Sequence, residues 1–243
     1  MTKTQRLRMT IDITMTILSI ILMGGNYLFP ADIVHEILGV GLFVLWAVHI
    51  TLNRRWYGAI FRGKYNAYRV MQTVINCCIL ICTIFLMISG IILSNHVFTF
   101  LNIQGGLGFA RIAHLLASHW YYLFMSLHIG LHVEVITNKM RHPAPINCHP
   151  ELVSGSSTNE MPKQVRHDKL RKIIPRIILA LVCAYGIYAF IARGVWKYLI
   201  LRQQFFFFDL DRGYILFALD YISIIILFAT ISHLIVSRLK KNR

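Results

Sequence analysis

The amino-acid sequence predicts an all-α, polytopic membrane protein, a helical bundle with about six transmembrane helices. Hydrophobic residues make up 56% of the 243-residue chain, whereas charged residues make up only 14%. A typical soluble domain has about 25% charged residues. The hydrophobic residues fall in six runs, each close to the roughly 20 residues that cross a bilayer. The Lys and Arg residues lie mostly at the ends of these runs, which is typical of membrane topology.

We expect the transmembrane helices at about residues 9–29, 32–52, 68–94, 111–136, 173–196 and 213–236. A short turn at Pro30 separates the first two, and Asp32 is the expected N-cap of the second. These two helices should therefore form a tight antiparallel hairpin. The first run has no small-residue cleavage site, so we expect a retained anchor rather than a signal peptide.

The distribution of positive charge predicts the orientation. Cytoplasmic loops of membrane proteins carry an excess of Lys and Arg. With both termini in the cytoplasm, most of the 25 basic residues fall on the inner side. A net charge of +15 would suggest a nucleic-acid partner in a soluble protein. Because the basic residues lie at the ends of predicted spans, we expect the lipid bilayer as the partner and no nucleic acid.

The chain divides into three parts. Residues 1–139 hold four predicted spans, and residues 170–243 hold two. Residues 140–169 between them are polar and contain several prolines and a pair of adjacent serines. This composition is typical of a loop, so we expect a mobile cytoplasmic linker that separates a four-helix half from a two-helix half.

Two of the predicted spans each carry a pair of histidines fourteen residues apart. The segment HEILGVGLFVLWAVH runs from His35 to His49, and HLLASHWYYLFMSLH runs from His114 to His128. Fourteen residues of α-helix rise about 21 Å and return to within about 40° of the starting direction. Each pair therefore shares one helix face. Since the two spans run in the same direction, we expect an outer pair of histidines at one depth and an inner pair at another.

This arrangement suggests haem binding. Ionisable residues within a span are costly and usually functional, and cofactor sites are built between facing helices of a bundle. Two stacked histidine pairs suit bis-histidine ligation of two b-type haems (heme b) by His35, His49, His114 and His128. No CxxCH attachment sequence occurs, so the haems would be held noncovalently.

Two further residues belong to the expected cofactor site. Gly39 follows His35 by about one helical turn, and the missing side chain would let a porphyrin approach. His132 follows His128 by about one turn. It is the alternative inner ligand to His128, or a partner for a haem propionate.

Other polar residues within the spans have competing interpretations. Glu36 could orient His35, accept a proton from a quinol, or be an interfacial carboxylate. His119 lies mid-membrane, away from His114, and is expected to pack between helices. Asp220 could relay a proton or hydrogen-bond to the outer loop.

Four segments resemble the flavinylation-associated cytochrome family. They are HEILGVGLFVLWAVHITLNRRWY, LMISGIILS, FARIAHLLASHWYYLFMSLHIGLH and LDYISIIILFATISH, in that order. The resemblance covers nearly the whole chain outside the predicted linker. It implies a multi-pass cytochrome b-like protein of the bacterial cytoplasmic membrane. It further implies that the protein passes electrons outward to extracytosolic proteins with covalently bound flavin. The histidine spacing is also similar to that of ferric-reductase-like and respiratory cytochrome b bundles.

The expected function is transmembrane electron transfer, as a subunit of a membrane oxidoreductase rather than a complete enzyme. The sequence has no soluble NAD- or FAD-binding domain, so electrons would come from a quinol or a cytoplasmic donor, and quinone is a further candidate ligand. The alternative is a non-redox membrane protein. It would be a metal-ion transporter that uses the histidines as metal ligands, or a structural or assembly subunit in which they pack between helices.

Overall fold

The computed structural model describes residues 3–29, 31–60, 62, 65–141, 163–206 and 213–241. Pro30, where a turn was expected, lies outside the described residues, as do residues 142–162 of the predicted linker. The elements in chain order are α1 (Lys3–Leu22), η1 (Gly25–Leu28), α2 (Asp32–Leu52), α3 (Arg54–Gly58), α4 (Ala67–Leu93), η2 (Thr99–Leu101), α5 (Leu107–Arg141), α6 (Lys163–Ala192), α7 (Val195–Leu199) and α8 (Gly213–Lys241). No β-strand occurs within these ranges, which confirms the all-α prediction for them.

Four helices in the described part of the chain are long and apolar enough to cross a membrane. They are α2, α4, the segment Ile173–Ala192 of α6, and α8. The chain is therefore a membrane protein. Helices α1 and α5 form where spans were expected, but they do not reach this hydropathy. Helix α5 carries four histidines and two serines, and the first two turns of α1 hold three basic residues.

Several helix boundaries differ from those expected. Helix α1 ends at Leu22 rather than near residue 29, because Gly24 and the positive-φ residue Gly25 (φ +60°) end the helix. Ala31, not Asp32, is the N-cap of α2. Asp32 is the first helical residue, where its negative charge is favourable at the positive end of the helix dipole. Helix α6 begins at Lys163, inside the predicted linker.

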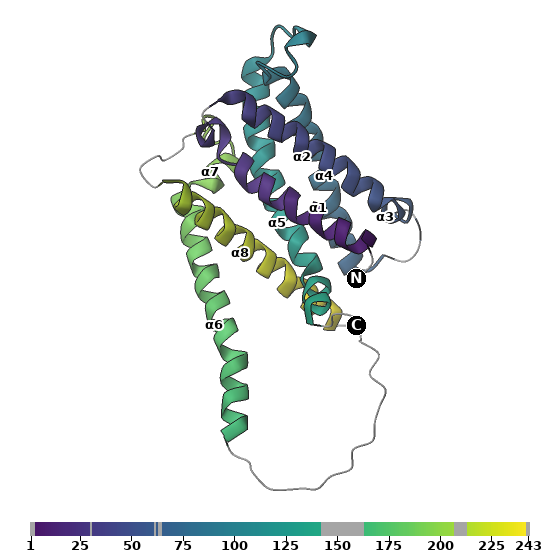
Figure 1. Cartoon of the computed structure of the whole chain (residues 1–243), viewed down its shortest axis with the longest axis vertical. Coiled ribbons are helices and arrows are strands. Elements are labelled where there is room, and N and C mark those ends of the chain that lie inside the picture. The colour runs from purple at the N-terminus through teal and green to yellow at the C-terminus, as the bar shows by residue number, and fades with distance from the viewer. Residues whose placement is uncertain are drawn as a thin grey trace.

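Helix α5 is the centre of the bundle. It packs against α4 along one side and against α8 along another, while α6 packs against α8 and α1 packs against α2 (Figure 1). The fully buried side chains of Tyr122 on α5 and Ile224 on α8 lie in the core between these helices. The central helix also carries the second histidine pair.

Two glycines allow close approach between helices. A Cβ atom at Gly130 of α5 would lie 2.3 Å from the backbone oxygen of Ala229 on α8. A Cβ atom at Gly186 of α6 would lie 2.6 Å from the backbone oxygen of Ser223, also on α8. Small residues at such contacts are typical of membrane bundles, where backbone packing takes the place of the hydrophobic effect between helices.

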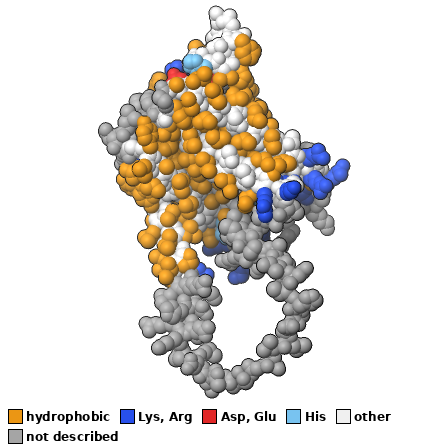
Figure 2. Space-filling view, viewed as in Figure 1, with side chains coloured by type: hydrophobic (Ala, Val, Ile, Leu, Met, Phe, Trp, Pro, Cys, Tyr) orange, Lys and Arg blue, Asp and Glu red, His pale blue; other side chains and the backbone are white. Residues whose placement is uncertain are grey.

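The surface fits a bilayer environment. Hydrophobic side chains cover most of the face seen in Figure 2, and Lys and Arg side chains gather toward one end, near α3. Helix α6 has a strongly exposed apolar surface, with Leu181 66% and Ile178 56% exposed. Side chains of this kind are stable against lipid and costly against water.

Candidate functional site

A cavity of about 740 Å³ separates α2 from α4 and α5. This volume lies within the range of about 300–1,000 Å³ that is usual for ligand and cofactor sites. Helix α2 packs so openly that none of its residues is buried, although it is one of the four apolar helices. The residues that line the cavity include His35, Gly39, Phe43, Gly90, His114, Ser118 and Tyr121.

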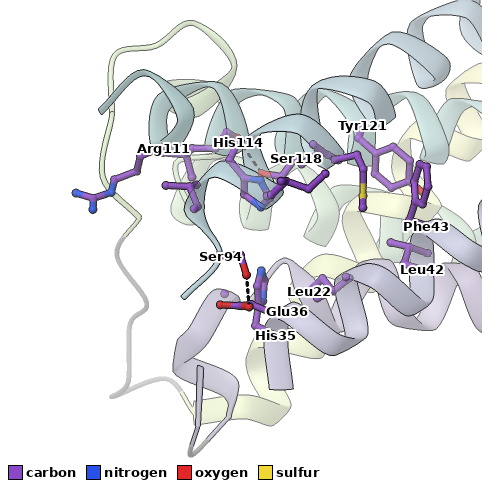
Figure 3. Close-up of a pocket in the computed structure, with 18 of the residues that line it drawn as sticks. Leu22, His35, Glu36, Leu42, Phe43, Ser94, Arg111, His114, Ser118 and Tyr121 are labelled. Carbon is purple, nitrogen blue, oxygen red and sulfur yellow. Dashed lines mark hydrogen bonds between the residues drawn. The ribbon is translucent and has the colours of Figure 1, made fainter. Parts of the chain in front are cut away.

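The outer histidine pair meets at this cavity. His35 of α2 and His114 of α5 project into the space between their helices (Figure 3). Their ring centres are 6.4 Å apart, and their planes are inclined by 64°. A first-row metal lies about 2 Å from an imidazole nitrogen, with the ring centre about 1.1 Å further away. Two imidazoles on opposite sides of one iron therefore have ring centres about 6.3 Å apart.

A hydrogen bond from α4 orients His114. The Ser89 hydroxyl lies 2.6 Å from the backbone oxygen of Phe85, to which it donates, and 3.0 Å from Nδ1 of His114. Because that hydroxyl has already given its proton to Phe85, it accepts the Nδ1–H of His114. The lone pair of His114 is then on Nε2, the nitrogen free to bind a metal. By contrast, Nδ1 of His35 has no hydrogen-bonding partner among the described residues.

Two glycines leave space around the outer pair. A Cβ atom at Gly39 would meet nothing within 4 Å, so this face of α2 is open to the cavity, as expected. A Cβ atom at Gly90 of α4 would lie 3.7 Å from Cε1 of His114. A larger side chain at Gly90 would therefore press on the His114 ring. The sequence analysis identified Gly39 but not Gly90.

Glu36 anchors the loop that follows α4. Its carboxylate accepts hydrogen bonds from the Ser94 hydroxyl (2.6 Å) and from the backbone N–H groups of Asn95 (2.8 Å) and Val97 (2.9 Å). These donors, rather than the adjacent His35, occupy the carboxylate oxygens (Figure 3). Glu36 thus holds the loop over the outer end of the cavity, and it does not orient the imidazole of His35.

The inner histidines lie on the same two helices as the outer pair. His49 of α2 and His128 of α5 are within electrostatic range of each other. Nδ1 of His49 lies 2.8 Å from a carboxylate oxygen of Asp12, and Nδ1 of His128 lies 2.8 Å from the amide oxygen of Asn76. Both oxygens are acceptors, so each Nδ1 carries the proton and each Nε2 carries a lone pair. The Asn53 amide nitrogen lies 3.4 Å from Nε2 of His49, at the long limit of a hydrogen bond.

His132 lies directly beside His128. The two ring centres are 4.8 Å apart, with the planes inclined by 60°. This separation is too short for the two rings to bind opposite sides of one iron, for which about 6.3 Å is needed. His132 and His128 therefore stand as alternatives for the same position opposite His49.

Three positioning residues escaped the sequence analysis: Asp12, Asn76 and Ser89. The sequence does carry a signal for Asp12, which is the only charged residue between Met9 and Phe29. A carboxylate inside an apolar run is itself an indication of function. Asn76 and Ser89 give no comparable signal, because single Asn and Ser residues are common in transmembrane helices.

His119 and Asp220 have structural contacts. The His119 ring is 1% exposed, bonds through Nδ1 to the Leu115 carbonyl (2.8 Å), and stacks on Tyr198 with ring centres 4.3 Å apart. The prediction of helix packing is confirmed for this residue. Asp220 of α8 pairs with Arg193 (2.8 Å) and accepts a hydrogen bond from Tyr185 of α6. Asp220 therefore ties α6 to α8.

Within the described ranges, no group of three or more His, Cys, Asp or Glu side chains is arranged to hold a metal ion. A haem iron needs only two ligands from the protein, since the porphyrin supplies the others. In comparisons with known proteins, the chain matches no protein-family model, no curated protein and no solved structure.

Proposed function

We propose that the protein is a transmembrane electron-transfer cytochrome that holds two b-type haems. The observation that carries the proposal is the separation of the His35 and His114 rings, 6.4 Å, beside an apolar cavity of about 740 Å³. Haem b supplies a one-electron carrier when it is bound. The chain supplies the ligands, the spacing and the low-dielectric surroundings, as one subunit of a membrane oxidoreductase.

The residues of the outer site fit this cofactor. His35 and His114 would provide the two axial nitrogens. Ser89 holds His114 in the tautomer whose Nε2 can bind iron. Gly39 and Gly90 keep the flanking helix faces clear. Most of the cavity wall is apolar, which is usual for a cofactor site.

The residues of the inner site support a second haem. His49 and His128 would provide its ligands, with His132 as the alternative to His128. Both Nδ1 atoms are held by oxygen acceptors on other helices, an arrangement typical of histidines that bind metals. Along the helices the inner and outer ligands are separated by about 21 Å, so that the two sites together span much of the bilayer.

The membrane arrangement that we propose has six spans with both termini in the cytoplasm. Helices α1 and α5 would be the other two spans, beside the four apolar helices. Helix α5 packs between α4 and α8, which shield it from lipid. The gathering of basic side chains toward one end of the molecule supports placing that end on the cytoplasmic side (Figure 2). In the bacterial cytoplasmic membrane, a quinol would donate electrons and an extracytosolic flavoprotein would accept them.

Haem quantification tests the proposal. We expect detergent-purified protein to contain two b-type haems per chain, seen in reduced-minus-oxidised spectra. His35→Ala should remove the outer haem and His128→Ala the inner one, each leaving about one haem per chain. His96→Ala is the matched control, because the His96 side chain is exposed in the loop after α4. Folded wild-type protein without haem, made with ample haem supply, would overturn the proposal.

A further inference from the structure

A smaller pocket lies where the chain passes from α2 to α4. Its volume is about 380 Å³, within the usual range for sites that bind small ligand groups. The wall is built from α3, the segment that follows it and the first two turns of α4. It includes two arginines, two aromatic side chains and a glutamine: Arg62, Arg69, Trp56, Tyr68 and Gln72. Among the described residues that line the pocket, every charged side chain is therefore positive.

The pocket lies at a membrane surface. Helices α2 and α4 are both apolar enough to cross the bilayer, so the connection between them, residues 53–66, emerges on one side of it. Lys and Arg side chains gather near α3 at this end of the molecule (Figure 2). Trp and Tyr side chains are enriched at the level of the lipid headgroups, and the pocket holds Trp56 and Tyr68. Lipid headgroups and small solutes of the adjacent water can thus reach it.

Arg69 builds the wall of the pocket. Its guanidinium donates hydrogen bonds to the backbone oxygens of Ala59 and Arg62, and so holds the segment after α3 against the start of α4. The same group lies over the ring of Tyr65, 4.6 Å from its centre. Arg62 differs, because its side chain is exposed. Arg69 therefore fixes the shape of the pocket, and Arg62 supplies a positive charge that a ligand can approach.

Few carboxylates oppose the positive charge of the pocket. No Asp or Glu occurs among residues 37–133. Of the acidic side chains that the structure describes, Asp12 and Glu134 lie toward this end of the bundle. Asp12 is hydrogen-bonded to a histidine of α2, and Glu134 is paired with Lys240 of α8. Lys240 also lies 5.4 Å from the centre of the Tyr68 ring, which brings a third positive charge near the pocket.

We propose that this pocket binds the phosphate group of an anionic phospholipid. Basic pockets between membrane helices typically bind the headgroups of anionic lipids. The planar guanidinium of Arg62 has paired N–H donors that match two phosphate oxygens. The bound lipid would fasten the connection between α2 and α4 to the membrane surface. The inference goes beyond the proposed function and does not depend on haem, so each can fail without the other.

The test is native mass spectrometry of the delipidated whole chain in detergent. Titration with phosphatidylglycerol, and separately with the net-neutral lipid phosphatidylcholine, gives the affinity for the first bound lipid of each kind. One basic side chain near an anionic lipid surface changes affinity about fivefold. With two arginines in the wall, we expect phosphatidylglycerol to bind about 25-fold more tightly than phosphatidylcholine. Equal affinities for the two lipids would overturn the inference.

Two substitutions probe the pocket, and a third is the matched control. Arg62→Gln removes one positive charge and should lower the affinity for phosphatidylglycerol about fivefold. Gln72→Glu keeps both arginines but adds a negative charge to the wall, and should lower the affinity by at least as much. Arg55→Gln removes a charge from an exposed residue of α3 that does not line the pocket. Its effect should be less than about twofold, because water and salt screen that charge.

Equal losses of affinity in Arg62→Gln and Arg55→Gln would show that general surface charge attracts the lipid, and would overturn the inference. Should Arg62→Gln fail to fold, Gln72→Glu decides, and an unchanged affinity in that variant would overturn it.

Inorganic phosphate distinguishes the two sources of a phosphate group. We expect inorganic phosphate at the same concentration as phosphatidylglycerol to leave the bound lipid in place. Displacement of the lipid at equal concentration would mean that the pocket takes free phosphate, which would overturn the assignment to a phospholipid.

Discussion

The outer and inner histidine pairs have the same sequence spacing but different surroundings. The outer pair lines a cavity and is flanked by two glycines, and the neutral hydroxyl of Ser89 orients one of its rings. The inner pair is held by a carboxylate and an amide, and a third histidine lies against it. The spacing is the same in both pairs, while the neighbouring helices decide what each pair can do. The outer site is defined by space and the inner site by hydrogen bonds.

Filling the outer cavity should have the largest effect. Gly39→Leu places a side chain in the open space beside His35, and we expect it to lower the haem content from two to about one per chain. Gly41→Leu is the matched control, because Gly41 also has open space around it but does not line the cavity. The measurement is haem per folded chain. Equal haem content in Gly39→Leu and Gly41→Leu would contradict the conclusion that open space defines the outer site.

Removing the neutral hydrogen-bond partners should have an intermediate effect. Asn76→Leu takes the acceptor from His128, and loss of such a partner typically costs about 10–100-fold in affinity. Ser89→Ala takes the acceptor from His114, and the effect should be smaller because the cavity walls still confine the ring. Haem loss to an apo-protein acceptor, followed over time, measures both. If Ser89→Ala lost haem faster than Asn76→Leu, the hydrogen bond would matter more at the outer site than at the inner one, opposite to our expectation.

Replacing His132 should have the smallest effect. The Asn76 amide oxygen lies 2.8 Å from Nδ1 of His128, which leaves Nε2 of that ring to bind iron, so we expect His128 to be the ligand. His132→Ala should then keep two haems, with only a slight change in the spectrum of the inner one. Loss of one haem in His132→Ala, with two retained in His128→Ala, would make His132 the inner ligand.

Much of the fold could be predicted from hydropathy. The apolar runs located α2, α4, α6 and α8, because a helix in lipid must be apolar along its length. The end of α1 was misplaced, since the run continues in composition through Gly24 and Gly25 although the backbone leaves the helix there. Hydropathy registers side chains, whereas the end of a helix also depends on backbone conformation.

The candidate site was predictable only in part. Periodicity placed each pair of histidines on one helix face, and the shared direction of the two spans matched their depths. The positioning residues lie far from their histidines along the chain: Asp12 is 37 residues from His49, and Asn76 is 52 residues from His128. Such contacts depend on how helices pack, and no local pattern reports them.

The sequence by itself determined that this is an α-helical membrane protein. It also determined that the two histidines of each pair lie on the same face of one helix, because they are fourteen residues apart. Both follow from local rules, the length of apolar runs and the pitch of an α-helix. Only the tertiary structure decided that the rings of His35 and His114 stand 6.4 Å apart beside a cavity, and that the carboxylate of Asp12 forms a hydrogen bond with His49. The physical reason is that distances between helices are set by side-chain packing across the whole bundle.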